Sequence, residues 1–526
     1  MPGIARILRA LACAALIALT ALALHAFAQR EFTLHLRDQA AHALALAASG
    51  DTPYRWRFHD SEDIVAGRVF GAAAFSFEDD ALIARSAGAP IEIGLPLPRA
   101  VDLSLFPHLQ IGAAADGPVL LDVVVRQTLD APELVLDGAS IASGISPQSI
   151  DVSLDRWTLD GHSVAAPNVA AMLRLRVRMP PGTVLHLSDV DLLRVANVRL
   201  DLFRPPQVVD SSAAAAVTGT HLYRLPFRSD LQTAQIETIA RSADPRLPVL
   251  ILLPQRGRVE QQVALRNAVF AALPGAILVP ETAIDDTFAH ARAESSTESG
   301  RTGLLRWIAL ALYAATLLWT RLRPPAQPRL RAVAEITLTL FGPLWLILFD
   351  RYTGKPDVLQ SALIAVSAAF AVSLSFPRQW RWNGSTRTWL LAFGIVAAAL
   401  LLGIALHDGA EPARSISPSH SARYIVWALV QQYLICAVCT DRWRIVTGNS
   451  AIAAWLGALG FALLHTPNAA LMIATFAGGL CWCALYLRER ALLPLAVSHA
   501  ASALLLLALL PRSILASAEV SARFFQ

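Results

Sequence analysis

Residues 451–487 read AIAAWLGALGFALLHTPNAALMIATFAGGLCWCALYL, which is two apolar runs joined by a short polar turn at His465. Neither run contains Asp, Glu, Lys or Arg. An α-helix needs ~20 mostly apolar residues to cross the hydrocarbon core of a bilayer, and uncharged runs approaching that length are typical of membrane helices. The stretch therefore predicts two membrane-embedded helices that follow each other closely.

Comparable apolar runs extend outward from this stretch in both directions. Apolar residues make up 55% of the sequence and the mean hydropathy is +0.48, which excludes an ordinary soluble protein. The predicted fold class is an α-helical polytopic membrane protein with eight helices, or nine with an N-terminal one. The runs cover residues 303–320, 332–349, 358–376, 389–407, 424–440, 451–465, 469–487 and 491–510.

Residues 1–29 predict a signal peptide or an anchor helix. Arg6 and Arg9 precede an apolar stretch that closes on Ala26-Phe27-Ala28, a small-x-small pattern at which signal peptides are cleaved. The stretch is nearly long enough to span a bilayer, so we favour an uncleaved anchor over a cleaved signal. Both alternatives predict that the segment that follows is exported.

Residues 30–204 show the alternation of a β-domain. The clearest case is Leu173-Arg174-Leu175-Arg176-Val177-Arg178, which turns through Pro180-Pro181-Gly182 into Val184-Leu185-His186-Leu187. Short strands at this spacing predict an exported, mainly-β sandwich. Residues 174–190 resemble the closing strands of a jelly roll of the galactose-binding type. That resemblance implies a sugar-binding sandwich, and we favour the alternative of a purely structural one.

The remaining domains follow from changes in composition. Residues 205–219 are rich in Pro, Ser and Ala and predict a linker. A small α/β segment is expected over 220–300, membrane helices over 301–422 and a further helical membrane domain over 423–512. In the α/β segment, a strand, a helix and a second strand fit one βαβ unit. This unit lacks a Gly-rich phosphate-binding loop, so we expect no cofactor.

The charge pattern predicts orientation and partners. The formal net charge is +4, and the arginines gather in loops at 321–331, 378–387, 441–444 and 488–490. The positive-inside rule places these loops in the cytoplasm and residues 30–300 outside. We therefore expect a bacterial inner membrane protein, surrounded by the lipid bilayer, with a periplasmic N-terminal domain. Because the chain has no broad basic face, we do not expect it to bind nucleic acid.

Four polar side chains interrupt the last apolar runs, namely Gln431, Gln432, His465 and His499. Amide and imidazole groups are costly at membrane depth unless they face the interior of a helix bundle. At about 1.5 Å per residue, Gln431 and His499 lie roughly 10 and 15 Å from the outward ends of their helices. We therefore treat the four residues as one candidate catalytic site.

Residues 424–510 resemble the CAAX protease and bacteriocin-processing family, the type II CAAX prenyl endopeptidase-like intramembrane proteases. The family pattern is Glu-Glu-x-x-x-Arg on one helix, Phe-x-x-x-His ending the next, and His-x-x-x-Asn on a later one. The phenylalanine and both histidines match, whereas both glutamates, the arginine and the asparagine are replaced. This sequence has Gln431-Gln432-Tyr433-Leu434-Ile435-Cys436, Phe461-Ala462-Leu463-Leu464-His465 and His499-Ala500-Ala501-Ser502-Ala503.

The resemblance implies an intramembrane endopeptidase with an altered active site. In the family, a glutamate activates water for attack on a peptide carbonyl, and the histidines and asparagine help to stabilise the oxyanion. A glutamine amide cannot take the proton, so this mechanism is closed if Gln431 occupies the base position. The amides and imidazoles could still bind a carbonyl, and His465 or His499 could act directly as a general base.

Structural roles are the alternatives for the same residues. Paired glutamines can join membrane helices by hydrogen bonds, and His465 at a helix end can reach interfacial water. His499 lies deeper and is harder to explain without a functional or ancestral site. Glu335 is expected to pair with Arg331, four residues earlier, or to reach the membrane surface.

The cysteines in the membrane runs do not predict a metal site. Cys436 with Cys439, and Cys481 with Cys483, lack the spacing of a zinc ribbon, whose paired motifs need loops that bring four ligands together. We expect these side chains to be small apolar filling between helices. A nucleophilic role for Cys436, which replaces the family arginine, is a minor alternative.

Three functions follow as hypotheses. The first is an intramembrane endopeptidase that processes an exported or membrane-anchored peptide. The second is a catalytically inactive relative that binds or scaffolds a membrane-anchored peptide or an envelope component. The third is an exported module that binds envelope carbohydrate and is held by an inert membrane anchor. We rank the endopeptidase first as a classification and only narrowly first as an activity.

Overall fold

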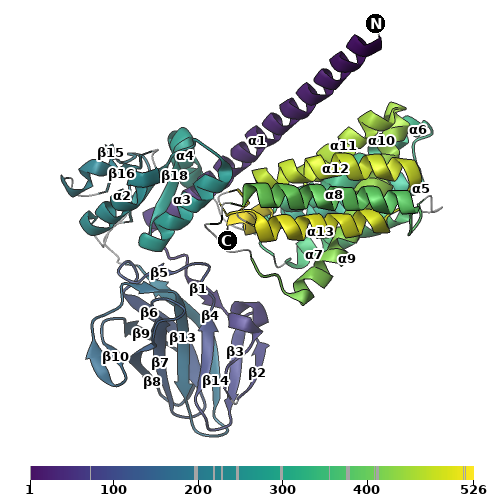
Figure 1. The fold of residues 1–526 in the computed structure, drawn as a ribbon. Coiled ribbons are helices and arrows are strands. Elements are labelled where there is room, and N and C mark those ends of the chain that lie inside the picture. Colours follow the sequence, from purple (N-terminus) through teal and green to yellow (C-terminus); the bar gives the residue numbers. More distant parts are fainter. Residues whose placement is uncertain are drawn as a thin grey trace. The chain divides into compact units, whose positions relative to one another are not determined.

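The computed structural model describes residues 2–525 except 72, 195–199, 217–219, 227–228, 244–247, 296–299, 355, 375–379, 408, 410–413, 513 and 516. Its contacts divide the chain into two compact units, and Figure 1 labels most of their elements. Unit 1 holds most of the apolar helices, and unit 2 holds the β-strands. Unit 1 comprises Met1–His35, Gly257–Ala264 and Glu298–Gln526, and unit 2 comprises Leu36–Arg256 and Leu265–Thr297.

Unit 2 contains the predicted β-sandwich, built from two six-stranded antiparallel sheets. One sheet has the order β2-β3-β14-β6-β9 with β1 also paired to β14, and the other has the order β11-β10-β8-β7-β13-β4. Apolar side chains of both sheets share one buried core. The first sheet consists of β1 (Arg55–Arg57), β2 (Ala73–Glu78), β3 (Ala81–Ser86), β6 (His108–Ala115), β9 (Gly144–Ser153) and β14 (Val184–Leu193). The second consists of β4 (Ile91–Leu95), β7 (Val119–Arg126), β8 (Leu134–Ile141), β10 (Trp157–Leu159), β11 (His162–Val164) and β13 (Met172–Arg178).

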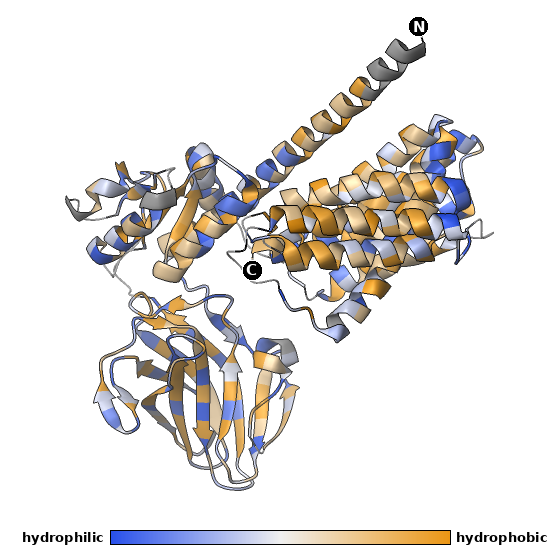
Figure 2. Ribbon diagram, viewed as in Figure 1, coloured by the Kyte–Doolittle hydropathy of each residue, from blue (hydrophilic) through white to orange (hydrophobic). Residues whose placement is uncertain are grey.

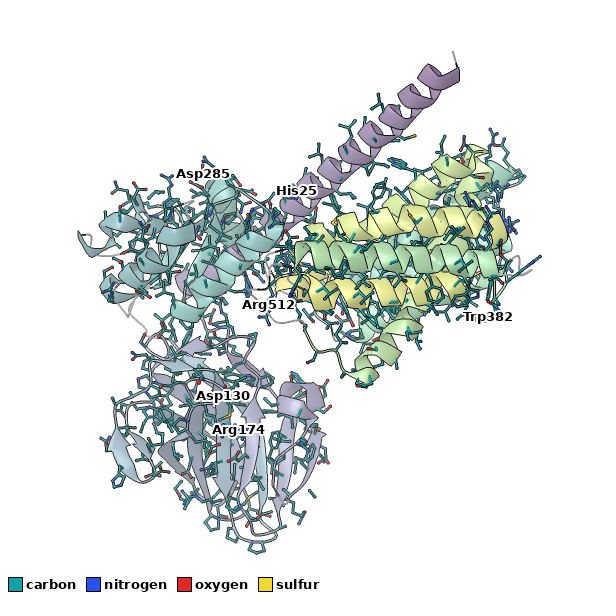
Figure 3. The ribbon with its side chains drawn as sticks, viewed as in Figure 1. His25, Asp130, Arg174, Asp285, Trp382 and Arg512 are labelled. Carbon is teal, nitrogen blue, oxygen red and sulfur yellow. The ribbon has the colours of Figure 1, made fainter. Side chains whose placement is uncertain are left out.

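The arginine stripe that predicted the sandwich is β13. Every second residue from Leu173 to Val177 is buried in the core, and the arginines between them lie on the other face. Arg174, labelled in Figure 3, pairs with Glu92 of the neighbouring β4 at 2.8 Å. The chain then turns at Gly182, whose φ of +83° favours glycine, and enters β14 in the opposite sheet.

Helix α1 (Pro2–Ser49) is much longer than the predicted anchor, so the prediction of a β-domain from residue 30 is wrong at its start. Ala40, Leu44 and Ala47 are buried together with Leu250 of the α/β sheet. Spacings of four and three residues place these side chains on one face of a helix. Charged residues scattered through 30–38 obscure this helical period in the sequence.

A parallel four-stranded sheet in the order β15-β16-β17-β18 follows the sandwich in the sequence. β17 and β18 are parallel neighbours in the sheet, and α3 connects them in the sequence. This confirms the predicted βαβ unit. The stretch 205–219, predicted as a linker, contributes β15 and a short 3-10 helix to this region. The elements are β15 (Val208–Asp210), β16 (Leu222–Arg224), α2 (Ser229–Ser242), β17 (Leu250–Leu253), α3 (Val259–Ala272), β18 (Ile277–Pro280) and α4 (Ile284–Ser295).

Helices of unit 1 correspond to the predicted apolar runs except for α10, which covers residues predicted as an arginine-rich loop, and Figure 2 shows apolar residues along the longer helices. They are α5 (Gly300–Leu322), α6 (Pro328–Leu344), α7 (Val358–Ser373), α8 (Thr386–Leu406), α9 (Pro418–Gln432), α10 (Asp441–Thr447), α11 (Ser450–Leu463), α12 (Ala469–Glu489) and α13 (Leu493–Leu509). Within the described residues, five helices are long and apolar enough to cross a membrane, at Leu11–Ser49, Pro328–Phe349, Thr386–Leu406, Ser421–Thr447 and Ala469–Glu489. Three shorter helices, α7, α11 and α13, are also apolar.

Several arginine-rich loops meet at one end of this bundle. The backbone N–H of Arg381 donates to the carbonyl of Arg490 at 2.8 Å, and the Arg490 guanidinium lies 3.4 Å from Asp441. Trp382 lies at this arginine-rich end and Arg512 at the opposite end (Figure 3). Loops that the sequence predicted on one side of the membrane therefore do lie together.

Glu335 is buried within α6 and forms the predicted ion pair with Arg331, at 2.8 Å. It also forms an ion pair with Arg442 of α10, which the sequence did not predict. Arg442 donates further hydrogen bonds to the backbone carbonyls of Val438 and Leu374. The carboxylate is thus neutralised from two sides, as a buried charge in a membrane helix requires.

Candidate functional site

Close packing of α11 against α12 forms one wall of the candidate site. Gly479 lacks a side chain, and a Cβ at this position would lie 3.1 Å from the Cα of Ala458. Small residues at such a crossing let membrane helices approach closely. The approach brings the ring of Phe461 on α11 to 6.2 Å from the indole of Trp482 on α12, measured between centroids.

His465 lies in the turn after α11 and is 5% exposed. Its Nδ1 is 2.8 Å from the carbonyl oxygen of Phe461, one turn earlier, and the two rings meet edge to face at 4.9 Å. Because a carbonyl can only accept, Nδ1 carries the proton of this hydrogen bond. In the neutral ring, Nε2 is then the acceptor that is left for a ligand.

His499 lies within α13, is 2% exposed and is surrounded by aromatic rings. Ring centroids lie 4.8 Å away for Trp482, 5.3 Å for Phe461 and 6.1 Å for Tyr424. Phe461 thus contacts the imidazoles of both His499 and His465. We call these two imidazoles and the three rings around them the histidine site.

Two polar atoms of α13 are buried without a hydrogen-bond partner in the described part of the chain, the Nδ1 of His499 and the Oγ of Ser502. Ser502 is 5% exposed. Most buried polar groups in proteins are paired, so such atoms point to a missing partner. Sequence reasoning missed Ser502 because the family pattern has its polar residue at the next position, which is Ala503 here.

Gln431 and Gln432 end α9 and are followed by an eight-residue π-helix, Tyr433–Thr440. The Oε1 of Gln432, a 1% exposed residue, accepts a hydrogen bond from the Sγ of Cys436 at 3.1 Å. The Oε1 of Gln431 is buried without a partner among the described residues. The hydrogen bonds and ring contacts of these residues join neither glutamine to His465 or His499. The structure therefore brings the two histidines together around Phe461, and α9, which carries both glutamines, contacts His499 through Tyr424.

The buried thiols form a separate group beside Gln432. Cys436, Cys439 and Cys483 are buried and free, and the hydroxyl of Thr440 contacts the Sγ of Cys483 at 3.3 Å. Among the described residues, no group of three or more His, Cys, Asp or Glu side chains is arranged to hold a metal ion. The π-helix that carries Cys436 and Cys439 has no counterpart in the predicted regular helix, and π-helical turns are frequent near functional sites.

The sequence around these helices matches one family model, described as type II CAAX prenyl endopeptidase Rce1-like, over residues 422–505. Residues 422–505 form an Rce1-like domain. This confirms the resemblance stated above. The Rce1-like domain contains all four predicted site residues and Ser502. No curated protein matches the chain.

Solved structures of carbohydrate-binding modules match part of the chain. A family 29 carbohydrate-binding module is 11% identical, with a TM-score of 0.17, covering 27% of this chain and 82% of its own. Variants of such a module complexed with mannohexaose and with cellulohexaose are 10% and 11% identical, with TM-scores of 0.20 and 0.17. They cover 28% of this chain, and 96% and 84% of their own.

A C-terminal strap, the described residues from Pro511 to Phe525, covers the turn that holds His465 in the Rce1-like domain. The backbone N–H of Ser521 donates to the carbonyl of Thr466 at 2.8 Å. Asn468 donates from its Nδ2 to the carbonyl of Ser517 at 2.7 Å, while its Oδ1 caps α12. Thr466 and Asn468 are fully buried as a result.

Proposed function

We propose that the Rce1-like domain binds a peptide segment of a membrane-anchored or exported protein at the histidine site, without the glutamate-dependent hydrolysis of the family. The observation that carries this proposal is the Nδ1 of His499, a buried imidazole nitrogen that no described residue satisfies. A peptide group offers one hydrogen-bond donor and one acceptor. Its arrival would satisfy a group whose burial otherwise costs free energy.

The surroundings of the glutamines argue against hydrolysis by the family route. The amide oxygen of Gln432 is engaged by the thiol of Cys436, the residue at the position of the family arginine. Within the described part of the chain, the hydrogen bonds and ion pairs of Asp and Glu side chains reach neither His465 nor His499. Glu335 is held by two arginines of its own. A carboxamide cannot accept the proton that water must lose.

We further propose that the arginine-rich end of the bundle faces the cytoplasm and that residues 30–300 are exported across the inner membrane. The gathering of Arg381 and Arg490 at one end supports this orientation, because cytoplasmic loops carry the excess of basic residues. His465 and the C-terminal strap would then face the periplasm. Accessibility of single cysteines introduced at Thr386 and Ser417 to a membrane-impermeant thiol reagent would test it.

The function is tested with the full-length protein in lipid nanodiscs and a library of tagged peptides carrying an acyl or a prenyl group. We expect the wild-type protein to retain a subset of peptides intact, and His499→Ala to lose them. The double variant Gln431→Glu, Gln432→Glu should gain cleavage if only the acidic pair separates this chain from an active peptidase. Failure of the wild-type protein to retain any peptide would overturn the proposal.

A histidine-dependent peptidase is the second candidate, and the unpartnered nitrogen of His499 favours it. A neutral imidazole can accept a proton from water without any carboxylate. In the same assay this candidate predicts cleavage by the wild-type protein that His499→Ala abolishes. Intact peptides after long incubation would rule it out in favour of binding alone.

A further inference from the structure

Two serines one turn apart on α13 differ sharply in their hydrogen bonds. Ser498 is fully paired, because its Oγ accepts from the indole Nε1 of Trp482 at 3.0 Å and donates to the carbonyl of Leu495 at 3.0 Å. Ser502 is also buried, yet its Oγ has no partner among the described residues. Residues four apart lie on the same face of a helix, so the two hydroxyls face the same region.

The hydroxyl of Ser502 also departs from the usual structural role of serine and threonine in membrane helices. Thr475 in α12 donates to the carbonyl of Leu471, four residues earlier, at 2.7 Å. Ser367 in α7 does the same with Leu363 at 2.7 Å. Such back-bonding satisfies a buried hydroxyl within its own helix. The hydroxyl of Ser502 does not donate to a carbonyl of its own helix, so it is available to an external group.

The second unpartnered atom of α13 lies next to this hydroxyl along the helix. His499 precedes Ser502 by three residues, a spacing that makes side chains neighbours on a helix surface. Its Nδ1 is buried and unsatisfied in the described part of the chain. A hydroxyl and a neutral imidazole nitrogen can each serve as donor or acceptor, depending on rotation and tautomer. Together they can supply one donor and one acceptor.

We propose that Ser502 is a third polar residue of the histidine site and that, with the Nδ1 of His499, it binds the backbone of a peptide. One of the two groups donates to a carbonyl oxygen, and the other accepts from the N–H of the same residue, which points to the same side in an extended backbone. This assignment rests on the proposed peptide-binding function, and it identifies the two side chains that recognise the peptide backbone. In the family pattern the polar residue of this helix is an asparagine, and this chain has Ala503 at that position. Ser502, one residue earlier, supplies the polar group instead.

Thermal unfolding of the full-length protein in detergent gives the first test. Ser498→Ala removes a satisfied hydroxyl and should lower the unfolding midpoint by a few degrees. Ser502→Ala removes an unsatisfied one and should leave the midpoint unchanged or raise it, because a buried unpaired hydroxyl destabilises the free protein. A midpoint lowered as far in Ser502→Ala as in Ser498→Ala would overturn the proposal, since Ser502 would then be structural.

The second test uses N-methylacetamide, the smallest molecule that carries a peptide unit, and protein labelled with ¹⁵N in histidine. We expect N-methylacetamide to shift the Nδ1 resonance of His499 in the wild-type protein, and to bind about tenfold more weakly to Ser502→Ala. Ser367→Ala, which removes a paired buried hydroxyl on α7 that makes no contact with the rings of the histidine site among the described residues, serves as the control and should keep the wild-type response. Equal responses in the wild-type protein and Ser502→Ala would overturn the role of Ser502.

The two proposals fail separately in these experiments. Retention of library peptides that is equal in the wild-type protein and Ser502→Ala would keep the proposed function and overturn the role of Ser502. A response to N-methylacetamide that depends on Ser502, with no peptide retained, would keep the role of Ser502 and overturn the proposed function.

Discussion

The indole of Trp482 lies against the imidazole of His499, with the two ring centroids 4.8 Å apart. The same indole is also held by a hydrogen bond, because its Nε1 donates to Ser498 in the next helix. A single side chain of α12 therefore packs against the buried imidazole of His499 and ties α12 to α13.

Replacing Trp482 by phenylalanine should keep the ring contact but remove the donor. We expect the free energy of unfolding to fall by about 0.5–1.5 kcal/mol, the usual worth of one such hydrogen bond. Chemical denaturation in detergent measures the change. Trp455→Phe is the matched control, because the Nε1 of Trp455 has no partner among the described residues. An equal loss in both variants would show that the hydrogen bond to Ser498 is not the cause.

The ion pair between Glu335 and Arg442 should show the behaviour of a buried charge. Arg442→Met leaves the Glu335 carboxylate with Arg331 alone, and we expect it to lose about 3 kcal/mol of stability. Adding Glu335→Gln removes the uncompensated charge and should recover most of the lost stability. The thermal midpoints of the single and double variants decide the matter. A double variant as unstable as Arg442→Met would contradict this account.

The exposed face of the sandwich should respond to acid through Glu133. Hydrogen bonds from Arg126 and then Arg176 hold the pKa of Glu133 below its usual value. A folded-state pKa below the unfolded one adds stability at neutral pH, which is lost as the pH falls through the folded value. The sandwich should therefore unfold at a lower urea concentration at acidic pH. Fluorinated Trp157, which is buried in the sandwich, reports this unfolding. Glu133→Gln should flatten that dependence, whereas the exposed Glu78→Gln should leave it intact.

Asn468 offers a way to detach the C-terminal strap while the helix cap is kept. Asn468→Ser keeps a side-chain oxygen that can cap α12 but loses the Nδ2 donor to Ser517. We expect faster hydrogen exchange over the described strap residues in this variant with little change in the bundle. Asn468→Ala should lose the cap as well, at about 0.5–2 kcal/mol. Unchanged exchange in Asn468→Ser would mean that other contacts suffice to hold the strap.

Local sequence patterns predicted much of this protein, because the spacing of side chains along a helix or a strand is set by the local backbone. Apolar runs predicted the helices of unit 1 other than α10, the stripe from Leu173 to Val177 predicted the sandwich, and a spacing of four residues predicted the pair between Arg331 and Glu335. The two histidines that the sequence singled out share contacts with Phe461. Their chemical role stays a prediction.

The features that escaped prediction depend on residues distant in sequence or on absent contacts. The strap meets Thr466 through Ser521, and nothing in the local sequence of either indicates the other. Ser502 becomes notable only because its hydroxyl lacks a partner, which is a property of packing. The sequence does not predict that α1 continues to Ser49, because charged residues between 30 and 38 interrupt the apolar pattern.

The strap also determines how a ligand can reach the histidine site. The strap is hydrogen-bonded over the turn of His465, so we expect a ligand of the proposed site to enter sideways, between helices and from the lipid, as long as the strap stays in place. Encounter then takes place in two dimensions. Occupancy would follow the number of ligand molecules per area of membrane, and diluting the bilayer with extra lipid would weaken binding even when the aqueous concentration is constant.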